Sequence, residues 1–374
     1  MKVLIFYASY GGGHLNAAKS IESYIIDNYK NIDVELIDCI KYVNKTLEKV
    51  TTVAYREMAK KVPWAWGKIY SDSQKGALAH LSSRSNKIMA IKLLKLLREK
   101  QPDLIISTHP FGSQMCSYLK RKGKISSKIA TIMTDFAPHD QWLVGNDFTD
   151  YYFVAHDKMK QYLINKDIPE SKIHTSGIPI SNRFFKKYDK NEILNKYNLS
   201  VEKQTILFFG GGEFGLGKTR TAEIFENFVN SDANIQIVAV AGRNPKMKAT
   251  FEEIVQKNNK SDIVRILEFT NEVPELMSIS DLVVTKPGGL TTSESLASNL
   301  PMVIINPIPG QEEENAEFLE SKGIAIWIKK SDNAELVINN LLSDSKKLAN
   351  MKDNTSLLAK PNSTLDICDI LLNK

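Results

Sequence analysis

A glycine-rich loop that carries one histidine follows the first apolar run of the chain. Residues 8–14 read Ala-Ser-Tyr-Gly-Gly-Gly-His, directly after the run at 3–7. The glycines let the backbone approach a ligand closely, and the N-terminus of a following helix favours negative charge. An imidazole is suited to proton transfer near neutral pH. We therefore interpret His14 as a candidate general base that faces the space between two domains; the plain alternative is a histidine that begins a helix and has no chemistry.

A second glycine loop, Gly210–Thr219, lies in the middle of the chain. From Gly212 onward it matches the pattern G-x-x-x-x-G-K-[ST], which cradles phosphates in P-loop NTPases. Such an enzyme also needs a Mg²⁺-holding aspartate at the end of a later strand. The later apolar runs end instead in Thr-Lys-Pro (285–287) and Asn-Pro (306–307). The same amides and helix dipole would bind the diphosphate of a nucleotide sugar without hydrolysing it, and we favour that interpretation.

Two further loops combine glycines with polar side chains. Residues 286–294 read Lys-Pro-Gly-Gly-Leu-Thr-Thr-Ser-Glu, a glycine turn that opens a helix with hydroxyl groups able to cap it. The carboxylate of Glu294 could accept hydrogen bonds from a ribose diol; a capping role is the alternative. Residues 306–315 read Asn-Pro-Ile-Pro-Gly-Gln-Glu-Glu-Glu-Asn. Their side chains could hold sugar hydroxyls, or form the solvated acidic start of a helix.

The elements that would position these loops alternate along the chain. Short apolar runs predict strands, and segments with helical spacing, such as 15–29 and 88–97, separate several of them. This alternation predicts an α/β fold with parallel sheets, whose ligands bind beyond the carboxyl ends of the strands. The predicted strands are 3–7, 34–37, 104–107, 129–133 and 151–155 in a first series, and 205–209, 235–239, 264–267, 282–285, 302–305 and 325–328 in a second.

Two series of strands predict two domains, the number expected for 374 residues. We place an N-terminal domain at 1–184, a polar, lysine-rich linker at 185–203, a C-terminal domain at 204–345 and a helical tail at 346–374. No apolar run approaches the length of a membrane span, and the first residues predict a buried strand and not a signal peptide. Three widely spaced cysteines match no metal site and indicate a reducing compartment. We therefore expect a cytoplasmic protein.

Basic and aromatic residues gather between residues 41 and 100. This segment holds 14 lysine or arginine residues against four acidic ones, with Trp64 and Trp66 among them. The simple interpretation is a solvated helix face. Taken together, the pattern favours attraction to an anionic membrane surface, with Lys60 and Lys61 toward the headgroups and the tryptophans at the interface. No nucleic-acid recognition motif accompanies the patch, so we expect no nucleic-acid partner.

Taken in order, these motifs resemble glycosyltransferase family 28. Gly-Gly-Leu-Thr-Thr-Ser-Glu at 288–294 and Pro-Gly-Gln-Glu-Glu-x-Asn at 309–315 are similar to the donor signature of that family. Gly242-Arg243-Asn244 and the segment 269–277 fit the same arrangement. One departure is the Lys-Pro that precedes the two glycines, where plant members have a different glycine and proline order.

The first half of the chain resembles the diacylglycerol branch of this family. That branch contains the monogalactosyldiacylglycerol synthases and the processive diacylglycerol glucosyltransferases. The similarity lies in the loop at 8–14, in Thr-Asp-Phe at 134–136 with His139 and Trp142, and in Ser-Gly-Ile-Pro at 176–179. The resemblance therefore covers nearly the whole chain.

The resemblance implies a GT-B fold, in which two Rossmann-like domains face a cleft and a C-terminal helix returns to the first domain. It also implies an inverting transfer from a UDP-sugar that needs no metal or other cofactor. His14 or Asp135 would be the base, and we favour His14. The implied donor-binding residues are Gly211, Gly212, Arg243, Phe269, Gly289, Thr291, Glu294, Gln311 and Glu312, and the implied acceptor or membrane residues are Gly12, Gly13, His139, Lys60, Lys61, Trp64 and Trp66.

Most of these donor residues have an implied role. The amides of Gly211 and Gly212, with Arg243, would stabilise the charge on the departing UDP. The backbone near Phe269 would read uracil, Glu294 would bind the ribose, and Gln311 with Glu312 would hold the transferred hexose. We therefore expect transfer of a hexose from a UDP-sugar to diacylglycerol on the inner face of the cell membrane. A polyprenyl-linked acceptor, a P-loop NTPase and a non-catalytic UDP-sugar sensor remain alternatives, and so do glucose and galactose as the hexose.

Overall fold

The computed structural model describes residues 1–9, 12–43, 77–145, 147–211 and 218–373. Within it the chain divides into two compact units. The first comprises Met1–Ser181, Pro309–Gln311 and Lys360–Lys374, and the second comprises Asn182–Ile308 and Glu312–Ala359. None of the described helices has the length and apolar content that crossing a bilayer requires.

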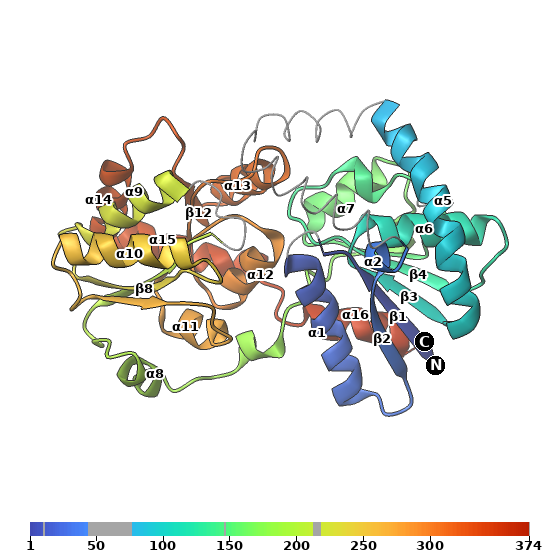
Figure 1. Cartoon of the computed structure of the whole chain (residues 1–374), viewed down its shortest axis with the longest axis horizontal. Coiled ribbons are helices and arrows are strands. Elements are labelled where there is room, and N and C mark those ends of the chain that lie inside the picture. The colour runs from blue at the N-terminus through green and yellow to red at the C-terminus, as the bar shows by residue number, and fades with distance from the viewer. Residues whose placement is uncertain (10–11, 44–76, 146, 212–217, 374) are drawn as a thin grey trace. The chain divides into compact units, whose positions relative to one another are not determined.

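The first unit is built on a parallel sheet of six strands (Figure 1). Five of these strands were predicted from apolar runs, with small differences at their ends. The sixth, β6, has only two residues, too few for a pattern to reveal it. The strands are β1 (Lys2–Tyr7), β2 (Asp33–Asp38), β3 (Leu104–Ser107), β4 (Lys128–Ile132), β5 (Tyr151–Phe153) and β6 (Ile173–His174), in the order β2-β1-β3-β4-β5-β6.

Helices cover both faces of this sheet. Successive side chains of β1 point to opposite faces, and both sets are apolar, so each face must be covered. Val3 and Ile5 are buried on the face covered by α1 (Gly12–Asn28) and α16 (Ser363–Leu372). Leu4 and Phe6 are buried on the other face, which is covered by α2 (Cys39–Val43), α5 (Ala77–Lys100) and α6 (Pro110–Arg121). The remaining helical elements of this unit are η1 (Asp140–Trp142), α7 (Asp157–Ile164) and η2 (Glu170–Lys172).

A close contact at Gly177 anchors the segment that leads into α16. Gly177 has a φ of +86°, and a Cβ atom there would lie 2.5 Å from the Cβ of Lys360. Any other residue would therefore be both strained and crowded at this position. The hydroxyl of Thr364 donates to the carbonyl oxygen of Ile180 at 3.0 Å, which fixes the first turn of α16.

The second unit holds a second parallel sheet of six strands, all predicted from the sequence. Phenylalanines from β7, α9 and α10 fill its core, with Phe208, Phe225 and Phe251 in mutual ring contact. The strands are β7 (Gln204–Phe209), β8 (Ile235–Val240), β9 (Val264–Leu267), β10 (Leu282–Thr285), β11 (Met302–Ile304) and β12 (Ala325–Trp327), in the order β12-β11-β10-β7-β8-β9; the helices are η3 (Asn182–Phe185), α8 (Lys190–Lys196), α9 (Lys218–Val229), α10 (Pro245–Lys257), α11 (Val273–Ile279), α12 (Gly289–Ala297), α13 (Gln311–Ser321), α14 (Ala334–Ser343) and α15 (Ser345–Leu358).

The segment 185–203 contains folded structure that belongs to the second unit. The carboxylate of Asp189 caps α8 by accepting from the amides of Asn191 and Glu192. Ile193 and Leu194 of this helix are buried. The polar composition of this segment predicted a linker. The structure shows instead a short helix, which docks through these two apolar side chains while its lysines lie elsewhere on its surface.

Each sheet has one point where the strand order changes direction. In the first unit β2 lies on one side of β1 and β3 to β6 lie on the other, so the change falls between β1 and β3. In the second unit it falls between β7 and β10. The loops that leave these neighbouring strands diverge to opposite sides, which leaves a crevice for ligands at the carboxyl ends of the strands.

Candidate functional site

His14 lies at the switch point of the first sheet, in the first turn of α1. Its Nδ1 is 2.6 Å from the carbonyl oxygen of Thr108, the residue that follows β3. The hydroxyl of Thr108 donates back to the carbonyl oxygen of His14 at 2.9 Å. These two contacts tie the loop after β1 to the loop after β3. The predicted base therefore has a fixed position.

The contact with Thr108 also determines which ring nitrogen of His14 carries the proton. A carbonyl oxygen can only accept, so the Nδ1 of His14 must donate and the lone pair of the neutral ring lies on Nε2. The hydroxyl oxygen of Thr134 lies 3.0 Å from the same Nδ1. Burial lowers the pKa of His14, while Asp135 and the Thr108 carbonyl partly oppose this effect. His14 is thus a neutral imidazole near pH 7, with the atom that accepts a proton known.

Asp135, the other predicted base, is buried and held by two neighbours. Its Oδ2 accepts a hydrogen bond from the indole nitrogen of Trp142 at 2.9 Å and lies 3.3 Å from Nε2 of His139. The turn η1 brings Trp142 into this position, and His139 is the residue that precedes it. These two contacts occupy Oδ2 of Asp135. Asp135 is therefore better placed to support His14 than to accept the proton of the acceptor itself.

The other residues predicted on the acceptor side are only partly covered by the structure. Gly12 and Gly13 begin α1, and Gly12 is exposed with open space beside its Cα. His139 is buried beside Asp135, in the interior of this cluster. The predicted membrane residues Lys60, Lys61, Trp64 and Trp66 lie outside the described residues, and so does Gly212 of the donor loop.

In the second unit, the glycine turn after β10 begins α12 at the switch point. Gly288 is the N-cap residue and offers no side-chain cap. The N–H groups of the first helical turn, from Gly289 to Thr291, have no partner within an α-helix. They are therefore available to an anion, and the helix dipole adds to the attraction. Gly289 and Thr291 thus lie where the sequence placed them, at a helix start that is uncapped by side chains.

Glu294 follows on the next turn of α12. Its side chain is partly buried, and burial raises the pKa of its carboxyl group to about 8. None of the described residues forms a side-chain hydrogen bond with it. A carboxyl group that lacks a donor and is kept from water has unused capacity for hydrogen bonds. This is the property that recognition of a diol requires.

Arg243 and Phe269 are brought together by the loops after β8 and β9. The guanidinium carbon of Arg243 lies 4.3 Å from the centre of the Phe269 ring. Phe269 is 53% exposed, which is unusual for a large apolar side chain. The cation–π contact holds the arginine against an exposed ring. Two predicted donor residues from different loops thus form one surface of the second unit.

The loop after β11 ends at α13, whose first two residues are Gln311 and Glu312. The carboxylate of Glu312 accepts from the amide of Ile308 at 2.6 Å, so it shapes the loop that precedes it. Asn315, one turn later, donates to the carbonyl oxygen of Pro287 at 2.9 Å and ties α13 to the glycine turn. The sequence analysis suggested the polar side chains of 306–315 for sugar hydroxyls and did not foresee this contact of Asn315 within the unit.

Lys286 is a residue that the sequence analysis did not select. It directly follows β10, and burial lowers the pKa of its ammonium group while Glu312 partly offsets this. A partly buried lysine at the switch point is suited to an anionic ligand, which would favour its charged form. Its position immediately after a predicted buried strand could have identified Lys286 as a candidate ligand-binding residue.

The residues predicted to bind the donor follow five neighbouring strands of the second sheet. Gly211, with a φ of +91°, follows β7, and Lys218 begins α9 beyond the part of this loop that is not described. Across the sheet from β11 to β9, the loops carry in turn Gln311 and Glu312, then Glu294, Gly211, Arg243 and Phe269. Apart from Gln311, which belongs to the first unit, they lie at the carboxyl edge, where ligands of such sheets bind.

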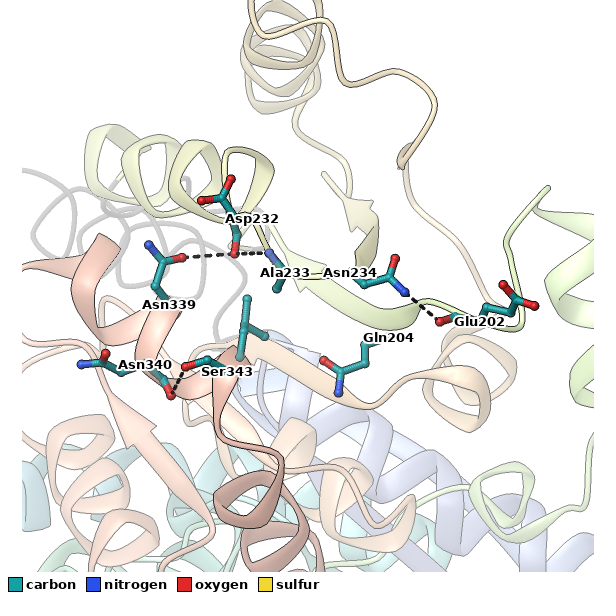
Figure 2. A pocket seen from close by; sticks show the side chains of 10 residues that line it. Glu202, Gln204, Asp232, Ala233, Asn234, Asn339, Asn340 and Ser343 are labelled. Carbon is teal, nitrogen blue, oxygen red and sulfur yellow. Dashed lines mark hydrogen bonds between the residues drawn. The ribbon is translucent and has the colours of Figure 1, made fainter.

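A pocket of about 650 Å³ lies at the opposite edge of this sheet, before β7 and β8 (Figure 2). Polar side chains of the pocket form hydrogen bonds within its wall. The hydroxyl of Ser231 donates to the side-chain oxygen of Asn339 at 3.1 Å, and the side-chain amide of Asn234 donates to the backbone carbonyl oxygen of Glu202 at 3.1 Å. It contains none of the predicted site residues, and ligands of open α/β sheets bind at the other edge. We therefore do not assign the donor site to it.

Comparison with solved structures shows the class of fold. MurG of Acinetobacter baumannii has a TM-score of 0.65 at 14% identity, and the match covers 100% of this chain and 99% of that one. HepE of Anabaena, solved in complex with UDP-glucose, has a TM-score of 0.57 at 14% identity with 100% of both chains covered. The two Rossmann-like units therefore form a GT-B fold.

Sequence comparison then shows the family. Residues 14–180 match the family model of monogalactosyldiacylglycerol (MGDG) synthase, and 189–357 match that of glycosyl transferases group 1. The processive diacylglycerol beta-glucosyltransferase of Bacillus cytotoxicus is 30% identical over 381 residues, covering 100% of this chain and 94% of the relative. That of Bacillus licheniformis is 30% identical over 388 residues, covering 100% and 96%. The chain belongs to the family of glycosyltransferases that contains the monogalactosyldiacylglycerol synthases and the processive diacylglycerol glucosyltransferases.

Proposed function

We propose that the protein transfers glucose from UDP-glucose to diacylglycerol and forms a β-glycoside with inversion at the anomeric carbon. The observation that carries this proposal is the state of His14. In a chain of this family, it is a neutral imidazole at the switch point of the first sheet, with its lone pair on Nε2. The names of its relatives, which are diacylglycerol glucosyltransferases, support glucose over galactose.

The transfer step follows from this geometry. Nε2 of His14 takes the proton of the acceptor hydroxyl while its oxygen forms a bond to the anomeric carbon of the sugar. The bond between that carbon and the diphosphate breaks, and the electron pair leaves with UDP. The imidazolium that results is stabilised by the Thr108 carbonyl and by the charge of Asp135. General-base catalysis of this kind contributes about 10²–10⁴-fold to a rate.

The second unit supplies the donor site in this proposal. The uncapped N-terminus of α12, the backbone at Gly211 and the guanidinium of Arg243 stabilise the departing diphosphate. Glu294 accepts hydrogen bonds from the ribose hydroxyls, and the backbone beside Phe269 reads uracil. Gln311 and Glu312 bind the hydroxyl groups of the hexose. Solved neighbours with UDP or UDP-glucose bound support a nucleotide-sugar ligand for this fold.

The names of the relatives, which are diacylglycerol glucosyltransferases, support diacylglycerol as the acceptor. A diacylglycerol remains in the bilayer, so the enzyme must act at a membrane surface. Residues 41–100, with their excess of lysine and arginine, supply attraction to anionic lipid on the cytoplasmic face. A polyprenyl-linked sugar would present a similar apolar tail and is the competing acceptor. The family resemblance further implies that the transfer needs no metal.

One experiment separates these possibilities. The protein is incubated with vesicles that contain diacylglycerol or a polyprenyl-linked sugar, with UDP-glucose or UDP-galactose, with and without EDTA. Glycolipid products are identified by mass spectrometry, and the anomeric configuration by proton NMR. A β-glucosyl diacylglycerol that forms equally in EDTA supports the proposal. Products only from the polyprenyl acceptor, an α-linked product, or release of UDP without glycolipid would each refute it.

A further inference from the structure

Two imidazoles meet at the switch point of the first sheet. The ring centroids of His14 and His109 are 4.7 Å apart, and the rings stand edge to face at 74°. His14 comes from the first turn of α1, and His109 is the N-cap residue of α6. Two rings this close repel each other strongly when both are charged. One of the two must therefore remain neutral when the other takes a proton.

His109 is the ring that stays neutral. Its Nδ1 accepts a hydrogen bond from the amide of Phe111 at 3.3 Å, so the proton of the neutral ring lies on Nε2. The N-terminus of α6 carries a partial positive charge, which disfavours a cation at the cap position. Burial, together with His14 and His139, holds the pKa of His109 well below its usual value.

His14 has the opposite arrangement. Its Nδ1 is protonated because it faces the Thr108 carbonyl at 2.6 Å, and the Thr134 hydroxyl oxygen lies 3.0 Å from the same nitrogen. Three described titratable groups act on it. His109, the N-cap residue of α6, packs against its ring, Asp135 favours its charged form, and His139 disfavours that form. Asp135 favours the charged form of His14, whereas the positive end of α6 disfavours the charged form of His109.

We propose that His109 is a positioning residue, whose neutral ring packs against His14 and makes His14 the imidazole that takes the first proton. The Thr108 carbonyl holds the lone pair of His14 at Nε2, and His109 fills the space beside the ring. The effect on turnover rests on the proposed function. The tautomers and the order of protonation belong to the protein without substrate.

The first test is nitrogen-15 NMR of the full chain labelled at histidine. The chain has six histidines, and the signals of His14 and His109 are assigned by comparison with the two single variants His14→Gln and His109→Asn. We expect His14 with its proton on Nδ1, His109 with its proton on Nε2, and a titration in which His14 charges at the higher pH. A proton on Nε2 of His14, or earlier charging of His109, would overturn the proposal.

The second test separates the two contacts of Nδ1. Thr134→Val keeps the shape of the side chain without its hydroxyl, and the proton of His14 should stay on Nδ1 because the Thr108 carbonyl remains. A proton on Nε2 of His14 in this variant would show that the Thr134 hydroxyl, and not the Thr108 carbonyl, sets the tautomer, and would overturn the assignment.

The third test removes the His109 ring but keeps the helix cap. Asparagine is among the best N-cap residues, so His109→Asn should fold. Water then reaches His14, its pKa moves up toward the ordinary value, and the acid limb of the kcat/KM profile shifts to higher pH while UDP affinity is unchanged. A uniform loss of activity with no shift of this limb would show that His109 only packs. If NMR gives the expected tautomers but no lipid is glycosylated, the proposed function fails and the positioning stands.

Discussion

Binding of UDP should release a proton from Glu294. Burial raises the pKa of this carboxyl group to about 8 in the free protein, so at pH 7 only about a tenth of it is ionised. Two ribose hydroxyls that donate to the carboxylate favour its charged form. A hydrogen bond to a charged group contributes about 1.5–3 kcal/mol, which corresponds to about one to two pK units. Two such bonds would bring the pKa below 7, and nearly one proton would leave on binding.

The size of the effect on affinity follows from the same pKa. Because the neutral acid must lose its proton before it accepts two hydrogen bonds, affinity should rise as pH passes through the pKa of the free protein. The ionised fraction increases from about a tenth at pH 7 to about nine tenths at pH 9, so UDP should bind roughly tenfold more tightly at pH 9. In Glu294→Gln this dependence should vanish, and affinity at pH 9 should fall by about 1–3 kcal/mol.

Isothermal titration calorimetry measures both quantities. Titrations at pH 7 in buffers with different enthalpies of ionisation give the number of protons released from the slope of the observed heat, and the same titrations give the affinity. Glu294→Gln is the matched control, since it keeps the shape and cannot ionise. A release near zero in the wild type, or an equal release in the variant, would refute the role of Glu294 in ribose binding.

The other expectations concern stability, catalysis, the competing nucleotide site and the membrane. Because the pKa of Glu294 is raised on folding, its favourable contribution is complete below pH 4.5 and is lost as pH rises through about 8; Glu294→Gln should therefore have a higher Tm than the wild type at pH 9 and an equal one at pH 4.5. His14→Ala should lower kcat by about two to four orders of magnitude with UDP affinity unchanged, and near-normal turnover would reassign the base. Lys218→Ala should leave UDP affinity almost unchanged, whereas a P-loop site would lose nucleotide binding altogether. Replacing Trp64 and Trp66 with alanine should weaken binding to anionic vesicles and activity on them; full activity, or equal binding to neutral vesicles, would mean that these residues pack in the interior.

Much of the fold was predictable because the buried strands are short, continuous apolar runs. The runs at Val3–Tyr7 and Leu282–Thr285 are buried on both faces of a parallel sheet, and such strands are visible in a sequence without any alternation. β6 escaped because two residues form no pattern. The helix α8 escaped because Ile193 and Leu194 stand among lysines and asparagines, which indicate a linker.

For the candidate site, the sequence located the loops more readily than the chemistry of their side chains. His14 and Glu294 were selected because glycine loops after strands mark the carboxyl edge of a sheet, and their roles stay predictions. The contacts that set their protonation were not accessible. Thr108 lies 94 residues from His14 in the sequence, and only the adjacency of β1 and β3 brings them together. His109 lies two residues after an ordinary apolar strand and belongs to no glycine motif, so its contact with His14 could not be predicted without the fold.

The packing of α16 has a consequence for how this chain is synthesised. Ile367, Cys368 and Leu371 lie in the same core as Val3 and Ile5, so that the first strand of the chain is covered by its last helix. During translation the entire second unit emerges before these residues do, and domains that can fold on their own do so as they leave the ribosome. The first unit must wait with one sheet face partly open. We therefore expect the second unit to fold first, and nascent chains paused before residue 363 to be the forms that chaperones and proteases recognise.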